Sequence, residues 1–145
     1  LNNVMLDDVT GEGVCVIDLD TVMPGLALYD FGDMCRSGTA SAREDEKDLS
    51  QVFCRMDMFK ALAEGYLSQA AFLTKPEREE LVFSARFITQ VIATRFLTDY
   101  LSGDVYFRIR YPEQNLNRFR MQMRMIQSME AQADAMERIV ENFGG

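Results

Sequence analysis

The sequence predicts an α+β fold that is mostly α, in which a short β-hairpin precedes a bundle of three to four helices. Two short, apolar and β-branched runs flank a glycine-containing turn within residues 1–20, whereas residues 57–144 repeat apolar side chains at the period of amphipathic helices. A chain of 145 residues, 48% of them hydrophobic, can bury a core without disulfides or metals. We therefore expect a single domain over residues 1–145, with the hairpin and a following helix in 1–36 and a helical subdomain in 49–145.

The hairpin is predicted from strands at residues 4–7 and 14–18, which a turn at 8–13 connects. If this loop is symmetric about its midpoint, Asn3 pairs with Asp18 and both side chains leave the same face. Directly opposed residues have Cβ atoms about 4.5–5.5 Å apart, so the two polar groups should lie close together. A bulge would shift this register by one residue.

The segment after the hairpin is predicted to hold a loop at 21–25 and a short helix at 28–35 that ends near Gly38. Residues 37–48 are polar and include an uninterrupted charged run at 43–48. We expect them to form an exposed, mobile loop.

The remaining chain is predicted to be helical. Asp57 can cap one helix, the capping box at 74–77 opens a long helix that Gly103 closes, and a final helix should run from Asn115 to Gly144. Their expected inward-facing residues are Phe59, Leu62, Ala63, Tyr66, Leu67 and Ala70 in the first, Leu81, Ala85, Ile88, Ile92 and Phe96 in the second, and Leu116, Phe119, Met123, Ile126, Met129, Ala133, Met136 and Val140 in the third.

Composition excludes several functional classes. The chain contains no histidine, which rules out Ser/His or Cys/His nucleophile pairs and the usual zinc sites. Its formal net charge of -8 argues against nucleic acid or an anionic membrane as the main partner. Charged residues interrupt the apolar windows, so no membrane span or signal peptide is expected.

The cysteines and the start of the chain indicate its setting. Cys15, Cys35 and Cys54 are odd in number and lie among apolar neighbours, which predicts reduced thiols packed in the interior of a cytoplasmic protein. The chain opens directly on a strand-like segment at Leu1, from which we expect a C-terminal fragment of a longer protein.

Acidic residues cluster around the end of the predicted hairpin. Asp18 and Asp20 lie at the exit of the second strand, and Asp30 and Asp33 lie one short helix later. Carboxylates this close repel one another unless a cation or hydrogen-bond donors offset their charge. Because Mg²⁺ favours one or two carboxylates with retained waters and phosphate oxygens, the pair of Asn3 and Asp18 is the candidate metal site.

At these residues the sequence resembles a known family. Segments 1–7, 16–21 and 28–33 resemble the C-terminal lobe of the aminoglycoside phosphotransferase and choline kinase superfamily, which has a protein-kinase-like fold. Segments 16–24, 29–33, 95–101 and 103–107 look most like the N-acetylhexosamine 1-kinase group. The resemblance implies an ATP- and Mg²⁺-dependent kinase of a sugar hydroxyl, namely an N-acetylhexosamine at its anomeric position.

The resemblance also implies roles for individual residues. Asn3 matches the Mg²⁺-binding asparagine of the catalytic loop, and Asp18 matches the second metal ligand. Asp20 would assist the metal or orient the substrate, and Asp30 would brace the catalytic loop. The catalytic aspartate would lie five residues before Asn3, upstream of Leu1, so the chain alone is expected to bind ATP poorly and to be inactive.

Two further sets of residues need separate interpretation. Residues 30–32 spell the Asp-Phe-Gly motif of protein kinases, but their helical pattern differs from the strand exit that the metal-binding motif requires. By resemblance, Arg95, Asp99 and Tyr106 are the candidate substrate residues. An ordinary i,i+4 ion pair between Arg95 and Asp99 is the alternative. Four acidic residues share the final helix with Arg118, Arg120 and Arg124, which favours a solvated face over a basic patch.

Other functions stay open at this stage. The same fold could phosphorylate choline, homoserine or an aminoglycoside, or the chain could be a non-catalytic helical interaction module. The expected partners are ATP and a small hydroxylated substrate, with no nucleic acid and no membrane. Apolar surface left uncovered by a missing N-terminal lobe could also support a homo-oligomer.

Overall fold

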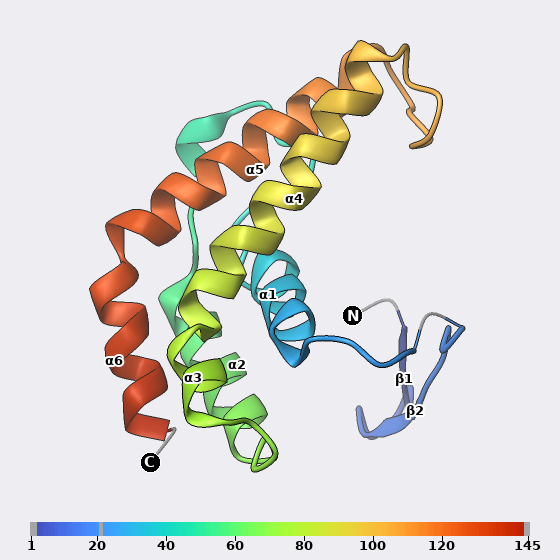
Figure 1. Ribbon diagram of the computed structural model, residues 1–145. Helices are drawn as coiled ribbons and strands as arrows, with labels where there is room; N and C mark the ends of the chain where they lie inside the picture. The colour runs from blue at the N-terminus through green and yellow to red at the C-terminus, as the bar shows by residue number, and fades with distance from the viewer. Residues whose placement is uncertain (1–2, 21, 144–145) are drawn as a thin grey trace.

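The computed structural model describes residues 3–20 and 22–143, and it confirms the predicted fold class (Figure 1). The positions Leu1, Asn2 and Thr21 of the family resemblance, and the predicted helix end at Gly144, lie outside the described residues. In order, the elements are β1 (Val4–Leu6), β2 (Gly13–Val16), α1 (Ala27–Gly38), the 3₁₀ helix η1 (Leu49–Gln51), α2 (Met56–Leu67), α3 (Lys75–Glu79), α4 (Leu81–Leu101), α5 (Gln114–Ala131) and α6 (Ala133–Phe143).

The helices form one bundle around a shared core. The long helix α4 packs along both α1 and α5, and α2 packs against α1 and α6 (Figure 1). The largest fully buried side chains come from five of these helices and include Phe31, Phe59, Leu81, Met121, Met125, Met129 and Met136. Helical periodicity therefore predicted many of the buried residues, although individual helix faces differ.

The hairpin stands apart from this bundle. β1 and β2 form a two-stranded antiparallel sheet, and every residue in both strands is exposed. Residues 22–26 lead into the start of α1 without forming a helix or strand (Figure 1). Side chains at this end are therefore set by the hairpin itself and not by core packing.

The predicted strand register is wrong by one residue. Val4 pairs with Val16 and Met5 with Cys15, whereas a bulge after Met5 pairs Leu6 with Gly13. A bulge places an extra residue in one strand, and this residue shifts every pairing on one side of it. The prediction assumed a symmetric loop without a bulge, so its pairings are displaced by one residue. Cys15 lies on this exposed hairpin and not in the interior, unlike the buried Cys35 and Cys54, and all three thiols are free.

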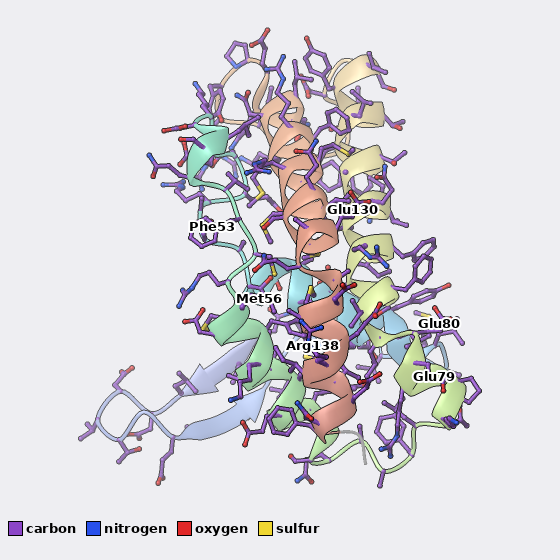
Figure 2. The ribbon with its side chains drawn as sticks, turned by 90° about the vertical axis from the view of Figure 1, so that its left-hand side faces the viewer. Phe53, Met56, Glu79, Glu80, Glu130 and Arg138 are labelled. Carbon is purple, nitrogen blue, oxygen red and sulfur yellow. The ribbon has the colours of Figure 1, made fainter. Side chains whose placement is uncertain are left out.

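Each of the two predicted long helices is interrupted. The capping box of Thr74 and Glu77 is present, but it opens only the short α3, and the chain bends at Glu80 before α4 begins. Glu79 and Glu80 lie exposed at this junction (Figure 2).

The final helix divides at Gln132, whose Nε2 donates to the carbonyl oxygens of Cys54 at 3.2 Å and Ser128 at 3.1 Å. Asp57 lies inside the first turn of α2, because the cap position belongs to Arg55.

The packing face of α5 also differs from the prediction. Leu116, Phe119 and Met123 are only half-buried. The helix instead buries a polar first turn, followed by apolar residues four apart; its buried residues are Gln114, Asn115, Asn117, Met121, Gln122, Met125, Ile126, Ser128 and Met129. The apolar period failed here because the first turn of α5 bonds to loops through amide side chains.

The charged run at 43–48 is a loop, as predicted, and four of its six residues are exposed, but it also contacts the helical bundle. Glu44 pairs with Arg36 at 3.2 Å, and Asp45 accepts a hydrogen bond from Gln114 Nε2 at 2.7 Å. Ala40 and Cys54 bridge the two ends of the segment in antiparallel fashion. These contacts hold the run against α1 and α5.

One helix in the described part of the chain, α4, is long and apolar enough by length and composition to cross a membrane. Arg86, Arg95 and Asp99 interrupt its apolar sequence, as the sequence analysis noted for the apolar windows, and the absence of a membrane span stays an expectation. The core helix of a globular domain passes the same test, and α4 lies between α1 and α5.

Candidate functional site

The structure brings Asn3 and Asp18 into direct contact. The Nδ2 of Asn3 donates a hydrogen bond to Oδ2 of Asp18 at 2.9 Å, joining residues fifteen positions apart across the two strands. The backbone carbonyl of Asn3 accepts from the amide of Ile17 at 2.9 Å, so Ile17 and not Asp18 stands opposite Asn3. The predicted proximity is thus correct although the predicted register is not.

Backbone geometry explains how Asp18 reaches Asn3. Asp18 has a φ of 63°, in the left-handed region that few residues other than glycine, asparagine and aspartate adopt. A left-handed residue just beyond β2 turns the chain out of the strand direction. This turn compensates for the one-residue register shift and returns the carboxylate to the Asn3 side.

The opposite end of the hairpin is fixed by local hydrogen bonds. Oδ1 of Asp7 accepts from the backbone amides of Thr10 at 2.8 Å and Val9 at 2.9 Å, and these bonds lower the pKa of Asp7. Gly11 follows with a φ of 73°, which a side chain would strain. The turn therefore sets the register that places Asn3 near Asp18.

The donor set of this pair fits a hard divalent cation. A carboxylate and an amide oxygen are both ligands that Mg²⁺ accepts, and the exposure of both side chains leaves room for waters and phosphate oxygens. Within residues 3–20 and 22–143, no group of three or more histidine, cysteine, aspartate or glutamate side chains gathers as a metal cluster. The pair therefore suits a metal shared with a substrate phosphate better than an all-protein cage.

The other predicted acidic residues lie around this pair without joining it. Asp20 is exposed and makes no hydrogen bond or ion pair with Asn3 or Asp18 in the described residues. Asp30 is exposed in the first turn of α1, where the helix dipole favours a negative charge. Burial, together with the nearby Asp30 charge, raises the pKa of Tyr66. Asp33 is occupied by an ion pair with Arg36 at 2.7 Å.

The three predicted substrate residues line one cavity at the C-terminal end of α4. This cavity has a volume of about 370 Å³ and is lined by Thr94, Arg95, Thr98, Asp99, Ser102, Val105, Tyr106 and Phe107. The guanidinium carbon of Arg95 lies 5.4 Å from the ring centroids of both Tyr106 and Phe107. The alternative ion pair between Arg95 and Asp99 is not formed in the described structure.

Asp99 holds the loop that carries Tyr106. Its buried carboxylate accepts from the backbone amides of Tyr106 at 2.8 Å and Phe107 at 2.9 Å, and from Asn115 Nδ2 at 2.8 Å. The same amide of Asn115 donates to Asp104 Oδ1 at 2.8 Å. Asp99 therefore positions Tyr106, and its direct contact with a substrate stays a prediction.

Asn115 is a site residue that the sequence analysis missed. It is fully buried at the start of α5, where an apolar repeat predicts only the helix and not the partners of its polar residues. The sequence contained one sign of this site. Three amide side chains lie close together at the start of the helix, namely Gln114, Asn115 and Asn117, and amide groups that become buried need hydrogen-bond partners.

The charge state of Asp99 predicts acid sensitivity. Desolvation opposes ionisation of Asp99, but hydrogen bonds from the backbone of residues 105–107 and from Asn115 outweigh it and lower its pKa. A carboxyl whose folded pKa is depressed adds stability above its unfolded pKa and loses it as the pH falls through the folded pKa. Asp99→Asn should therefore melt several degrees below wild type at pH 7, and the gap should shrink below about pH 4. Melting curves between pH 2.5 and 7 measure this, and a gap that is constant over that range would contradict the role given to Asp99.

A comparison with known protein families finds a match for the N-terminal part of the chain. Residues 1–67 match the phosphotransferase enzyme family (APH). The match covers less than half of the chain and extends from the hairpin, with Asn3 and Asp18, to the end of α2. It supports the resemblance to the aminoglycoside phosphotransferase superfamily over these residues. Arg95, Asp99 and Tyr106 lie beyond the matched segment.

Proposed function

We propose that the protein carrying this chain is an ATP- and Mg²⁺-dependent phosphotransferase that phosphorylates a sugar hydroxyl, an N-acetylhexosamine at its anomeric position. The contact between Asn3 and Asp18 carries the proposal. It places two metal-ligand types together within the segment that matches the phosphotransferase enzyme family.

In this proposal Asn3 and Asp18 hold the metal against the phosphates of ATP. A bound Mg²⁺ supplies positive charge that offsets the charge on phosphate oxygens during transfer, and little covalent chemistry is left for the protein. The two side chains orient the ion from one exposed edge of the hairpin.

The cavity of Arg95 and Tyr106 supports a neutral, hydroxylated acceptor. A cationic acceptor such as choline or an aminoglycoside requires free carboxylates or an aromatic cage. The lining carboxylate, Asp99, is already engaged by backbone amides and Asn115, and Arg95 adds a positive charge to the cavity wall. Tyr106 is 71% exposed and offers an apolar ring face beside the hydrogen-bonding guanidinium, a combination that suits a sugar ring.

An acceptor panel tests the proposed substrate class. Full-length protein, ATP and Mg²⁺ are incubated separately with N-acetylglucosamine, N-acetylgalactosamine, choline, homoserine and an aminoglycoside, and phosphorylated product is measured. We expect the highest kcat/KM for an N-acetylhexosamine, with an acid-labile anomeric phosphate as product. A higher value for a cationic acceptor would contradict the substrate assignment, and no transfer to any acceptor would favour the non-catalytic module.

Arg95→Ala should separate substrate binding from chemistry. Loss of one charged hydrogen bond costs about 1.5–3 kcal/mol, so we expect the KM for the sugar to rise about 10- to 100-fold while the KM for ATP stays unchanged. Arg138→Ala, on the exposed surface of α6, provides the matched control (Figure 2). An unchanged sugar KM in Arg95→Ala would remove Arg95 from the acceptor site.

A further inference from the structure

A large, open cavity lies at a second place in the fold that the proposed reaction does not use. It has a volume of about 1050 Å³ and lies between the charged segment after α1 and the loop that connects α4 to α5; its lining residues are Arg43, Glu44, Asp45, Arg108, Ile109, Arg110, Gln114 and Arg118. We call it the arginine groove. Figures 1 and 2 place both of its segments at the end of the bundle opposite the hairpin.

The arginine groove is positively charged on a chain whose formal net charge is -8. Four guanidinium groups line it and only two carboxylates accompany them. Both carboxylates are engaged within the fold. Glu44 contacts Arg36 at 3.2 Å and Arg118 at 3.5 Å, and Asp45 pairs with Arg43 at 3.7 Å and accepts from Gln114 Nε2 at 2.7 Å. The excess positive charge of the groove therefore comes from Arg108 and Arg110.

Several guanidinium donors in the groove have no acceptor. In the part of the chain that the structure describes, the exposed side chains of Arg108 and Arg110 make no hydrogen bond or ion pair. The Nε of Arg118 is buried and makes no hydrogen bond, but it is ion-paired with Oε2 of Glu44 at 3.5 Å. The guanidinium groups of Arg108 and Arg110 therefore supply the donors that a ligand in the groove would meet.

The groove is also held in shape before any ligand arrives. The backbone amide of Arg110 donates to Gln114 Oε1 at 2.7 Å, which ties the loop to the first turn of α5. Nη1 of Arg118 donates to Asn115 Oδ1 at 2.8 Å, which fixes the direction of its guanidinium group. A preorganised site loses less conformational entropy on binding.

We propose that the arginine groove binds a small phosphate-bearing anion. Guanidinium groups present paired donors that match phosphate oxygens, and such charge-assisted hydrogen bonds are stronger than neutral ones. The volume suits a phosphorylated metabolite or nucleotide, and the concave shape favours a small molecule over the surface of an acidic protein. The proposal depends on neither Asn3 nor Asp18, so it stands apart from the phosphotransferase assignment.

Calorimetric titration with inorganic pyrophosphate tests the site. The titration is performed in EDTA, which removes metal-bridged binding at the hairpin, and at constant ionic strength set with sodium chloride. The test variant is Arg108→Gln/Arg110→Gln. Its charge-matched control is Lys60→Gln/Arg138→Gln, whose two side chains are exposed outside the groove.

We expect wild type and the control to bind pyrophosphate with dissociation constants within twofold of each other. The test variant should bind more than about tenfold more weakly, because two charge-assisted contacts are lost. The single variant Arg108→Gln should show an intermediate loss, and Asn3→Ala should bind as wild type does. Unchanged melting temperatures would confirm that the exposed substitutions leave the fold intact.

Three results would overturn the proposal. These are no measurable pyrophosphate binding by wild type, equal weakening in the test variant and the control, or tighter groove-dependent binding of an acidic peptide than of any phosphate compound. Parallel titrations with AMP and glucose 6-phosphate identify the source of the phosphate. Groove-dependent binding of either compound supports the site and shows whether a nucleotide or a sugar phosphate occupies it.

Discussion

Asp18→Ala is expected to lower the kcat for phosphoryl transfer by the full-length protein by at least about 10²–10³-fold, the usual cost of removing one electrostatic stabiliser of a transition state. The carboxylate is the only charged member of the pair with Asn3, so its loss should abolish metal retention at the hairpin. Because Asp18 is exposed and lies outside the core, unfolding of the helical bundle should change little, even though alanine is disfavoured at the left-handed φ of 63°. A coupled assay at saturating ATP and Mg²⁺ measures the loss.

Other substitutions on the hairpin act as controls. Asn3→Ala should give a comparable decrease, because the amide is the second proposed ligand. Asp8→Ala removes an equal charge from the exposed turn of the same hairpin and should leave kcat unchanged. Asp20→Ala should have a smaller effect than Asp18→Ala, since Asp20 does not contact the pair in the described structure. Full turnover by Asp18→Ala would contradict the metal assignment.

Gly32→Ala is expected to reduce the free energy of unfolding by about 1–3 kcal/mol, the range for overpacking a tight core. A Cβ at Gly32 would lie 2.6 Å from the carbonyl oxygen of Ser84 and 2.8 Å from Cγ1 of Ile88. The first of these atoms belongs to the backbone of α4 and cannot rotate away. Alanine favours helices over glycine, so steric overlap must exceed that gain. Chemical denaturation at pH 7 measures the change.

Gly65→Ala is the matched control for this prediction. Gly65 lies in α2 with no atom within 4 Å of its would-be Cβ, so alanine should stabilise by about 0.5–1 kcal/mol. Opposite signs for the two variants would show that α1 and α4 need close backbone contact at Gly32. Equal stabilisation by both would refute that contact.

The Asp-Phe-Gly motif at 30–32 thus contributes to helix packing in this chain. Phe31 is fully buried and meets Phe59 at a ring-centroid distance of 6.3 Å, and Gly32 admits the backbone of α4. The sequence analysis predicted this helical context correctly, because the apolar period and the preceding Pro24–Gly25 turn both exclude a strand exit. The local sequence pattern was sufficient here, because interactions between residues close in sequence determine that this segment is helical.

Local pattern failed where distant polar groups decide the structure. The helix break at Gln132 coincides with a hydrogen bond from its side chain to the carbonyl of Cys54, seventy-eight positions away. Glu44 and Arg118 looked solvated in sequence because their neighbours are charged. Their mutual contact depends on how the segment after α1 lies against α5, and no window of the sequence contains both.

The candidate site, like the fold, could be predicted only in part from the sequence. Proximity of Asn3 and Asp18 followed from any hairpin of roughly that length, whereas the left-handed backbone at Asp18 that achieves it did not. The family resemblance brought Arg95, Asp99 and Tyr106 together, and the structure then showed that Asp99 bonds to the loop backbone. Asn115 escaped notice because its role depends on Asp99 and Asp104 together.

Paramagnetic broadening by Mn²⁺, used as a substitute for Mg²⁺, tests the metal site most directly. Titration into isotope-labelled protein with a non-hydrolysable ATP analogue should first broaden the resonances of Asn3 and Asp18 and their hairpin neighbours. Asp18→Ala should remove this selective broadening, whereas Asp8→Ala should retain it. Broadening spread evenly over the acidic surface, or centred on residues distant from the hairpin, would contradict the metal-binding role of Asn3 and Asp18.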